Sequence, residues 1–155
     1  MLSIFIRPLA VAFMASLFAL GAFAQTVTVH KTPWCGCCTK WVDHLRDNGF
    51  EVVVLEKEDL APVRAELGVP NELMSCHTGE VDGYALEGHV PADQVKRLLS
   101  ERPDAKGLSV PGMPMGSPGM ESPYPADTYD VILFSEAGAT PYATYTGGDM
   151  VSLGD

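Results

Sequence analysis

Three of the four cysteines lie in one stretch of five residues, Trp34-Cys35-Gly36-Cys37-Cys38. A β-branched run, Val27-Thr28-Val29, precedes this stretch, and Trp41, Val42 and Leu45 follow it at helical spacing. The pattern predicts a strand that ends in a turn and opens a helix, which places the cysteines over the free backbone N–H groups of the first helical turn. Because the positive end of the helix dipole favours thiolate over thiol, we expect acidic, nucleophilic sulfurs that bind metal.

Cys35 and Cys38 have the C-x-x-C spacing that lets a disulfide close across one helical turn. Four cysteines allow three pairings, and a bond between the adjacent Cys37 and Cys38 would strain disulfide geometry. A structural Cys37–Cys76 disulfide beside a Cys35–Cys38 redox pair is one alternative. Three sulfurs within four residues nevertheless favour metal or redox chemistry over purely structural bridging.

Residues 1–24 have the pattern of a cleaved signal peptide. Arg7 precedes an apolar run from Leu9 to Leu20, and Ala22-Phe23-Ala24 is a small-x-small cleavage signal. The apolar run is shorter than the roughly 20 residues of a membrane-spanning helix. We therefore expect export to the periplasm, an oxidising compartment, and no membrane anchor after cleavage.

The chain is acidic, with 20 aspartates and glutamates against 10 lysines and arginines and a formal net charge of −10. This balance argues against nucleic acid or anionic lipid as a partner. The sequence contains no phosphate loop, nucleotide fingerprint or Ser-His-Asp arrangement. Its length fits one domain, which we divide into a core over 25–106 and an extension over 107–155.

The first half of the chain predicts a right-handed βαβ unit from a strand over 27–31, a helix over 37–48 and a buried parallel strand over 52–55. Residues 71–78 and those after Gly147 are irregular. The remaining expected elements are a short helix over 60–67, a strand over 83–88, a helix beginning at Pro91, a strand over 131–134 and its hairpin partner over 142–145. The fold class is therefore α/β.

Residues 107–125 are rich in glycine and proline, which excludes regular structure there. Such a long loop within a compact domain is either disordered or functional. Met113, Met115 and Met120 lie along it, where they cannot all fill a core. We expect these thioethers to be metal ligands.

Cys76-His77 offers a second thiolate beside an imidazole in an irregular segment. Thiolates and thioethers together select Cu(I), whereas zinc prefers four Cys or His ligands, so zinc is the alternative metal. Sulfurs that bridge ions could hold more than one copper. We assign His44 to the surface and His89 to a structural role before a helix. The predicted ligands are Cys35, Cys37, Cys38, Cys76, His77, Met113, Met115 and Met120.

The stretch Trp34–Cys38 is similar to the thioredoxin motif W-C-G-P-C, with Cys37 in place of proline. More closely, the chain resembles the CopG-type family of periplasmic copper-resistance proteins, which carry a C-x-C-C motif. The matching stretches are Thr32–Cys38, Ser75–Thr78, Gly83–Ala92 and Gly107–Glu121. The resemblance implies a thioredoxin-like domain with a Gly/Pro/Met-rich C-terminal extension that helps to bind copper. It carries over the four cysteines, His77 and the three loop methionines as metal-site residues.

The residues and the resemblance together predict a monomeric periplasmic protein that binds Cu(I) or Cu(II). The resemblance implies a thiol-based oxidoreductase in copper resistance, which interconverts or sequesters the metal, and we expect Cys35 and Cys38 to be its catalytic pair. Its partners are then copper ions and periplasmic copper export or chaperone proteins. The alternatives are a copper chaperone or buffer without turnover, and a thiol-disulfide oxidoreductase that does not need metal.

Overall fold

The computed structural model describes residues 25–154, so the predicted signal peptide lies outside the described residues. One eight-stranded sheet in the order β2-β1-β3-β4-β5-β6-β7-β8 forms the framework. Its strands are β1 (Thr26–Lys31), β2 (Glu51–Glu56), β3 (Thr78–Val81), β4 (Tyr84–Glu87), β5 (Gly107–Ser109), β6 (Thr128–Ser135), β7 (Gly138–Thr146) and β8 (Asp149–Leu153). The helices are α1 (Gly36–Asp47), α2 (Ala61–Leu67), the 3-10 turn η1 (Asn71–Leu73) and α3 (Ala92–Glu101). The α/β prediction is confirmed.

The predicted βαβ unit is present: β1 and β2 pair in parallel, with Val27 opposite Val52. Helix α1 buries Trp41, Val42 and Leu45 on one stripe, as its spacing predicts. The prediction of a buried second parallel strand is wrong, because β2 is an edge strand with Val53 and Leu55 more than 40 % exposed. Strand β1 lies between β2 and β3, which places its carboxyl end inside the sheet.

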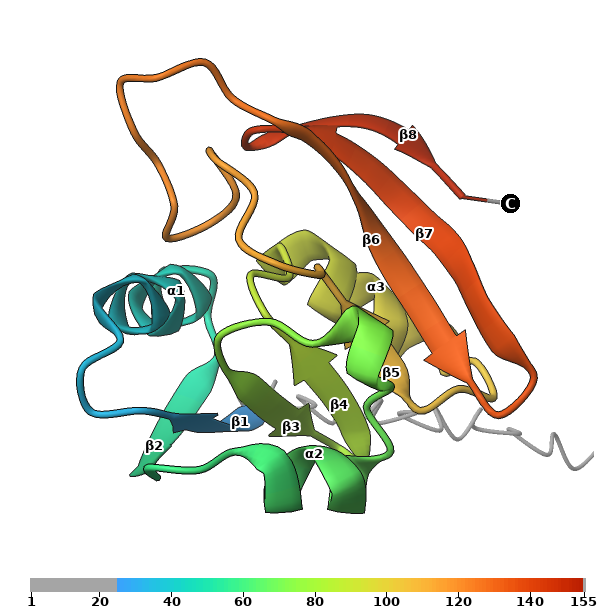
Figure 1. Ribbon diagram of the computed structural model, residues 1–155. Helices are drawn as coiled ribbons and strands as arrows, with labels where there is room; N and C mark the ends of the chain where they lie inside the picture. Colours follow the sequence, from blue (N-terminus) through green and yellow to red (C-terminus); the bar gives the residue numbers. More distant parts are fainter. Residues whose placement is uncertain (1–24, 155) are drawn as a thin grey trace, which may run out of the picture.

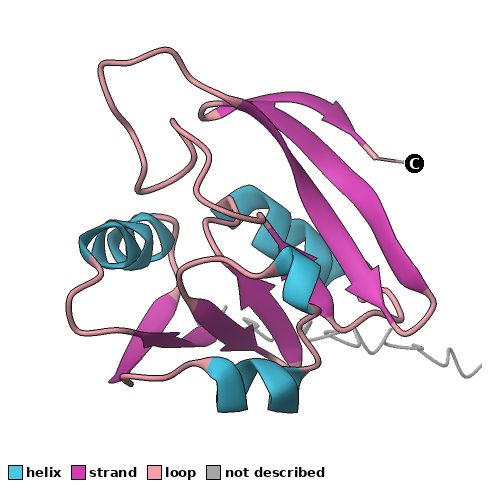
Figure 2. Ribbon diagram, viewed as in Figure 1, coloured by secondary structure: helices cyan, strands magenta, loops and turns pink. Residues whose placement is uncertain are grey.

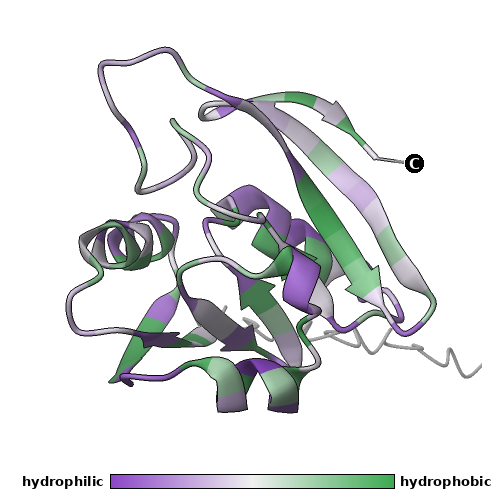
Figure 3. Ribbon diagram, in the orientation of Figure 1, coloured by the Kyte–Doolittle hydropathy of each residue, from purple (hydrophilic) through white to green (hydrophobic). Residues whose placement is uncertain are grey.

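Helices cover both faces of the first strands, with α1 and α3 on one side and α2 on the other (Figure 1). The pleat divides the core accordingly. Leu86 of β4 packs with Val27 and Leu98 in the main cluster, whereas its neighbour Ala85 packs with Phe134 on the α2 side. Figure 3 shows hydrophobic residues concentrated along β4 and β6, the strands that contribute to both clusters.

Strand β3 forms a hairpin with β4. It begins at Thr78, the last residue of the segment that was expected to be irregular. Asp82 and Gly83 connect the two strands, and both have positive φ, 49° and 85°. A two-residue Asp-Gly loop with this backbone is a type I′ turn, which matches the twist of antiparallel strands. The turn sets the register, in which Thr78 pairs with Glu87.

Helix α3 connects β4 to the parallel strand β5. Pro91, expected as the first helical residue, is instead the N-cap. His44, expected at the surface, accepts a hydrogen bond on Nε2 from the Ala92 N–H at 3.0 Å and so joins α1 to the start of α3. Strand β5 itself corrects the expectation that residues 107–125 lack regular structure. Gly107 lets it approach β4, since a Cβ there would overlap the Ala85 carbonyl.

Strands β6 and β7 form the predicted hairpin and extend beyond the helical part of the molecule together with β8 (Figure 1). The residues after Gly147 were expected to be frayed, but they form β8 along β7. Tyr145 stacks on Tyr129 at 5.8 Å and accepts a hydrogen bond from Gln94 of α3 at 2.8 Å. This contact fixes the hairpin to the body.

The long loop between β5 and β6 crosses towards α1 without helix or strand (Figure 2). Backbone hydrogen bonds within the loop include Gly116 N–H to Met120 O at 2.9 Å and Met120 N–H to Ser117 O at 2.7 Å. Gly119 has φ +85°, and a Cβ there would lie 2.8 Å from the backbone nitrogen of Trp41 and 2.9 Å from the carbonyl oxygen of Cys37. Glycine is therefore what lets the loop lie against α1.

No helix within residues 25–154 is both long and apolar enough to cross a bilayer.

We predict that Gly119→Ala destabilises the protein more than Gly49→Ala. Both glycines have positive φ, but a Cβ at Gly49 meets nothing within 4 Å. The control should therefore cost about 1–2 kcal/mol in backbone strain. Gly119→Ala adds roughly 1–3 kcal/mol of overpacking against α1. Urea unfolding of both variants measures the difference, and equal losses would show that the loop does not depend on this close approach.

Candidate metal centre

The cysteine turn lies at the start of α1, as the sequence predicts. Cys35 is the N-cap residue, and its N–H bonds the Thr32 carbonyl at 3.2 Å, which closes the turn after β1. Cys37 and Cys38 occupy the first helical turn. Cys35 and Cys38 form a disulfide with their Cα atoms 5.4 Å apart, whereas Cys37 and Cys76 are free. The alternative of a Cys37–Cys76 structural bridge is thus not adopted in this state.

Cys76 brings the fourth sulfur to the turn from the segment between η1 and β3. Its Sγ lies 4.0 Å from Cys37 Sγ, which in turn lies 3.5 Å from Cys35 Sγ. The sulfurs of Cys35, Cys37, Cys38 and Cys76 all lie within 4.8 Å of one another. Residues 39 positions apart in the sequence therefore form one set of soft donors.

Two imidazoles also contact the Cys76 sulfur. His77 Nδ1 lies 3.3 Å from Cys76 Sγ, and His89 Nε2 lies 3.0 Å from it. The three groups form a second set of donor atoms within 4.8 Å, so Cys76 belongs to both sets. His77 thus lies against Cys76, its neighbour in the sequence, and its role as a ligand stays a prediction.

His89 is the site residue that the sequence interpretation missed. In the β3–β4 register Thr78 pairs with Glu87, and continuing this register beyond the strands sets Cys76 opposite His89. The Asp82-Gly83 turn is the signal that could have identified this pair. His89 Nδ1 donates to the Pro118 carbonyl at 2.7 Å, which leaves Nε2 as the free lone pair facing Cys76.

Burial controls the protonation of these groups. It raises the pKa of the Cys76 thiol to about 12, and the neighbouring Cys37 contributes further. It lowers the pKa of His89, and it lowers that of His77, whose cation would also be repelled by His89. His77 is fully buried with its ring 4.3 Å from that of Trp41, and its Nε2 has no hydrogen-bond partner among the described residues. The site thus favours neutral imidazoles and a protonated Cys76 until a cation displaces the proton.

The loop methionines lie in the segment that reaches the site through Pro118. Met113 is 56 % exposed, and Met115 and Met120 are half-buried. Their role as ligands stays a prediction.

Comparisons with known proteins identify the family of this chain. A family model described as a protein of unknown function, DUF411, matches residues 73–120, which include Cys76, His77 and His89. Form 1 of the copper resistance protein CopG is 44 % identical, with a TM-score of 0.76 over 81 % of this chain and 100 % of that one. Form 2 is also 44 % identical, with a TM-score of 0.75 over 79 % and 99 %. The chain belongs to the CopG family of copper resistance proteins.

The search of curated proteins found no match to this CopG-family chain. Both solved structures are of a copper resistance protein, and the four clustered cysteines of this chain could hold a metal ion.

We predict that the metal-free protein loses stability as the pH falls through about 6.5. The unfolded chain binds protons at its histidines from that pH downwards, while the folded state with lowered pKa values resists them. Each such histidine contributes up to about 1.4 kcal/mol of destabilisation per pH unit. His77→Phe preserves a ring against Trp41 and removes one of these groups, so its free energy of unfolding should depend less steeply on pH between 7 and 5. Chemical denaturation across this range measures both slopes, and identical slopes would contradict the assignment.

Proposed function

We propose that this CopG-family protein binds Cu(I) through Cys35, Cys37, Cys38 and Cys76, with His77 and His89 as additional ligands. The observation that carries the proposal is the gathering of three other cysteine sulfurs and two imidazole nitrogens around the Cys76 sulfur. Thiolates select Cu(I) over harder cations. Because Cys76 belongs to both donor sets, its sulfur could bridge two ions, which supports a site for more than one copper.

The Cys35–Cys38 disulfide supports coupling of copper binding to redox chemistry. Oxidation of the two thiols to the disulfide releases two electrons and two protons, and two Cu(II) ions that take one electron each become Cu(I). The reverse reaction oxidises two Cu(I) ions and regenerates both thiols. In this proposal Cys35 and Cys38 are the catalytic pair, and when they form the disulfide Cys37, Cys76 and the histidines are the ligands that remain.

A thioredoxin-like domain is consistent with this chemistry. The order β2-β1-β3-β4, with a C-x-x-C pair at the start of the helix after β1 and a helix after β4, supports that part of the prediction. The apolar run from Leu9 to Leu20 supports export to the periplasm. There the protein would receive copper from, or pass it to, export or chaperone proteins.

A metal-independent thiol-disulfide oxidoreductase is a second candidate, favoured by the disulfide at the helix start and by Trp34, which is 71 % exposed beside it. Reduction of a protein disulfide such as insulin by the metal-free protein would support this candidate. A copper chaperone or buffer would bind copper and leave its oxidation state unchanged.

We predict that the reduced protein binds Cu(I) in preference to zinc and that the disulfide form binds it at least about tenfold more weakly, since two of the thiolates are then absent. Anaerobic Cu(I) titration with elemental analysis, before and after reduction, measures stoichiometry and affinity. Competition dialysis against both metals tests selectivity. Zinc that stays at stoichiometric occupancy in excess Cu(I) would refute the copper assignment.

The methionine prediction has its own test, the triple variant Met113→Leu, Met115→Leu and Met120→Leu. Leucine keeps the apolar bulk and removes the thioethers, so we expect normal folding and Cu(I) affinity weakened on the order of tenfold. Unchanged affinity would show that the cysteines and histidines bind copper without the loop sulfurs.

A further inference from the structure

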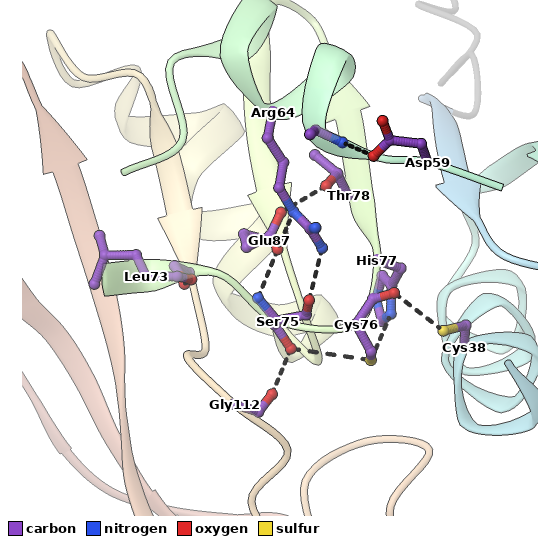
Figure 4. A network of polar contacts seen from close by, with 12 residues as sticks. Cys38, Asp59, Arg64, Leu73, Ser75, Cys76, His77, Thr78, Glu87 and Gly112 are labelled. Carbon is purple, nitrogen blue, oxygen red and sulfur yellow. Dashed lines mark hydrogen bonds and ion pairs between the residues drawn. The ribbon is translucent and has the colours of Figure 1, made fainter. Parts of the chain in front are cut away.

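The fully buried carboxylate of Glu87 contacts the segment that carries Cys76. Glu87, the last residue of β4, has no exposed surface. Its Oε1 accepts hydrogen bonds from Arg64 Nε at 2.9 Å and from the Ser75 backbone N–H at 2.7 Å, and its Oε2 accepts one from Thr78 Oγ1 at 2.6 Å (Figure 4). All the donors come from outside β4, so this side chain joins three parts of the chain.

Arg64 of α2 completes the arrangement. Its Nη2 donates to the Ser75 carbonyl at 2.6 Å while its Nε bonds Glu87. The backbone N–H and C=O of Ser75 are therefore both held by one buried ion pair. A buried ion pair is weak evidence for stability, because its desolvation cost offsets much of its attraction. Its location beside Cys76 points to a different role.

The residues after Glu87 hold the following part of the same segment. Gly88 N–H bonds the His77 carbonyl at 3.0 Å, and a Cβ on Gly88, which has φ +72°, would overlap the Ser75 side chain. His89 contacts the Cys76 sulfur at 3.0 Å. Residues 87–89 thus hold residues 75–77 by three contacts, and one of these is made by the Cys76 thiol.

These contacts leave the two free thiols, Cys37 and Cys76, close to each other but not bonded. Cys76 Sγ and Cys37 Sγ lie 4.0 Å apart, about twice the roughly 2.05 Å of a disulfide bond. In an oxidising compartment two neighbouring free thiols tend to pair. Pairing would transfer two electrons and two protons to an oxidant such as glutathione disulfide and remove both thiolates from the metal site.

We propose that Glu87 and Arg64 are positioning residues that hold the Cys76 sulfur against His89 and apart from Cys37, which keeps both thiols available for metal. The availability for copper rests on the proposed function. The control of Cys37–Cys76 pairing does not, and it can be measured without metal.

The central variant is Glu87→Gln combined with Arg64→Met, which removes both charges together. Either single replacement by an apolar residue would leave an unpaired buried charge and endanger folding. Arg64→Lys is a second variant, since lysine keeps the charge but has one nitrogen for two acceptors. Val131→Ala is the control, because it makes a cavity in β6 away from the site and destabilises the protein without touching these residues.

The first measurement uses reduced, copper-free protein equilibrated with glutathione and glutathione disulfide, followed by mass mapping of the Cys37–Cys76 disulfide. The double variant and Arg64→Lys should raise the ratio of this disulfide to the two thiols on the order of tenfold. The parent and Val131→Ala should agree. A folded double variant with the parent's ratio, or a control that shifts equally, would overturn the proposal.

The second measurement is Cu(I) affinity by competition with a chromophoric Cu(I) chelator, with the double variant expected about tenfold weaker than both parent and control. Equal affinities would refute the role in copper binding. If the parent itself binds no Cu(I), the proposed function fails, and the disulfide ratio still decides whether Glu87 and Arg64 position Cys76.

Discussion

The site depends on how Trp41 packs. Its indole N–H donates to the Val90 carbonyl at 2.9 Å, its ring lies 4.3 Å from that of His77, and it sits so close over Gly79 that a Cβ there would be 3.3 Å away. The side chain is fully buried and lies one helical turn after Cys37. This one residue therefore fixes α1 relative to both the β3–β4 hairpin and the residues around His89. Without this packing of Trp41, the cysteine turn would have no defined position relative to Cys76.

The parts of the fold that the sequence predicts are those with a strong local pattern. The βαβ unit follows from the β-branched runs and from the stripe of Trp41, Val42 and Leu45. The β6–β7 hairpin follows from two apolar runs. Strands β3, β5 and β8 were missed because their residues are polar, few or exposed, and their pairing with neighbours makes them strands.

The residues of the candidate site divide in the same way, into those with a local sequence pattern and those without one. The C-x-x-C spacing identifies Cys35 and Cys38 from five residues of sequence, and Cys76-His77 stands out by composition. His89 does not, because Gly88-His89-Val90-Pro91 reads locally as the approach to a helix. Its role comes from a register that starts at the turn of Asp82 and Gly83 and ends six residues away on either side. A position defined by register has no local signal at the residue itself.

The register also bears on the order in which the centre assembles during folding. Cys76 and His89 are only 13 positions apart and meet across a tight turn, and hairpins of this kind form within about 1–10 μs. Cys37 and Cys76 are 39 positions apart, and their approach waits for the larger loss of chain entropy when α1 docks. The histidine half of the centre can therefore exist before the cysteine turn arrives. If the chain is exported unfolded, as proposed, one thiol would already contact an imidazole while the other three are still exposed to oxidants.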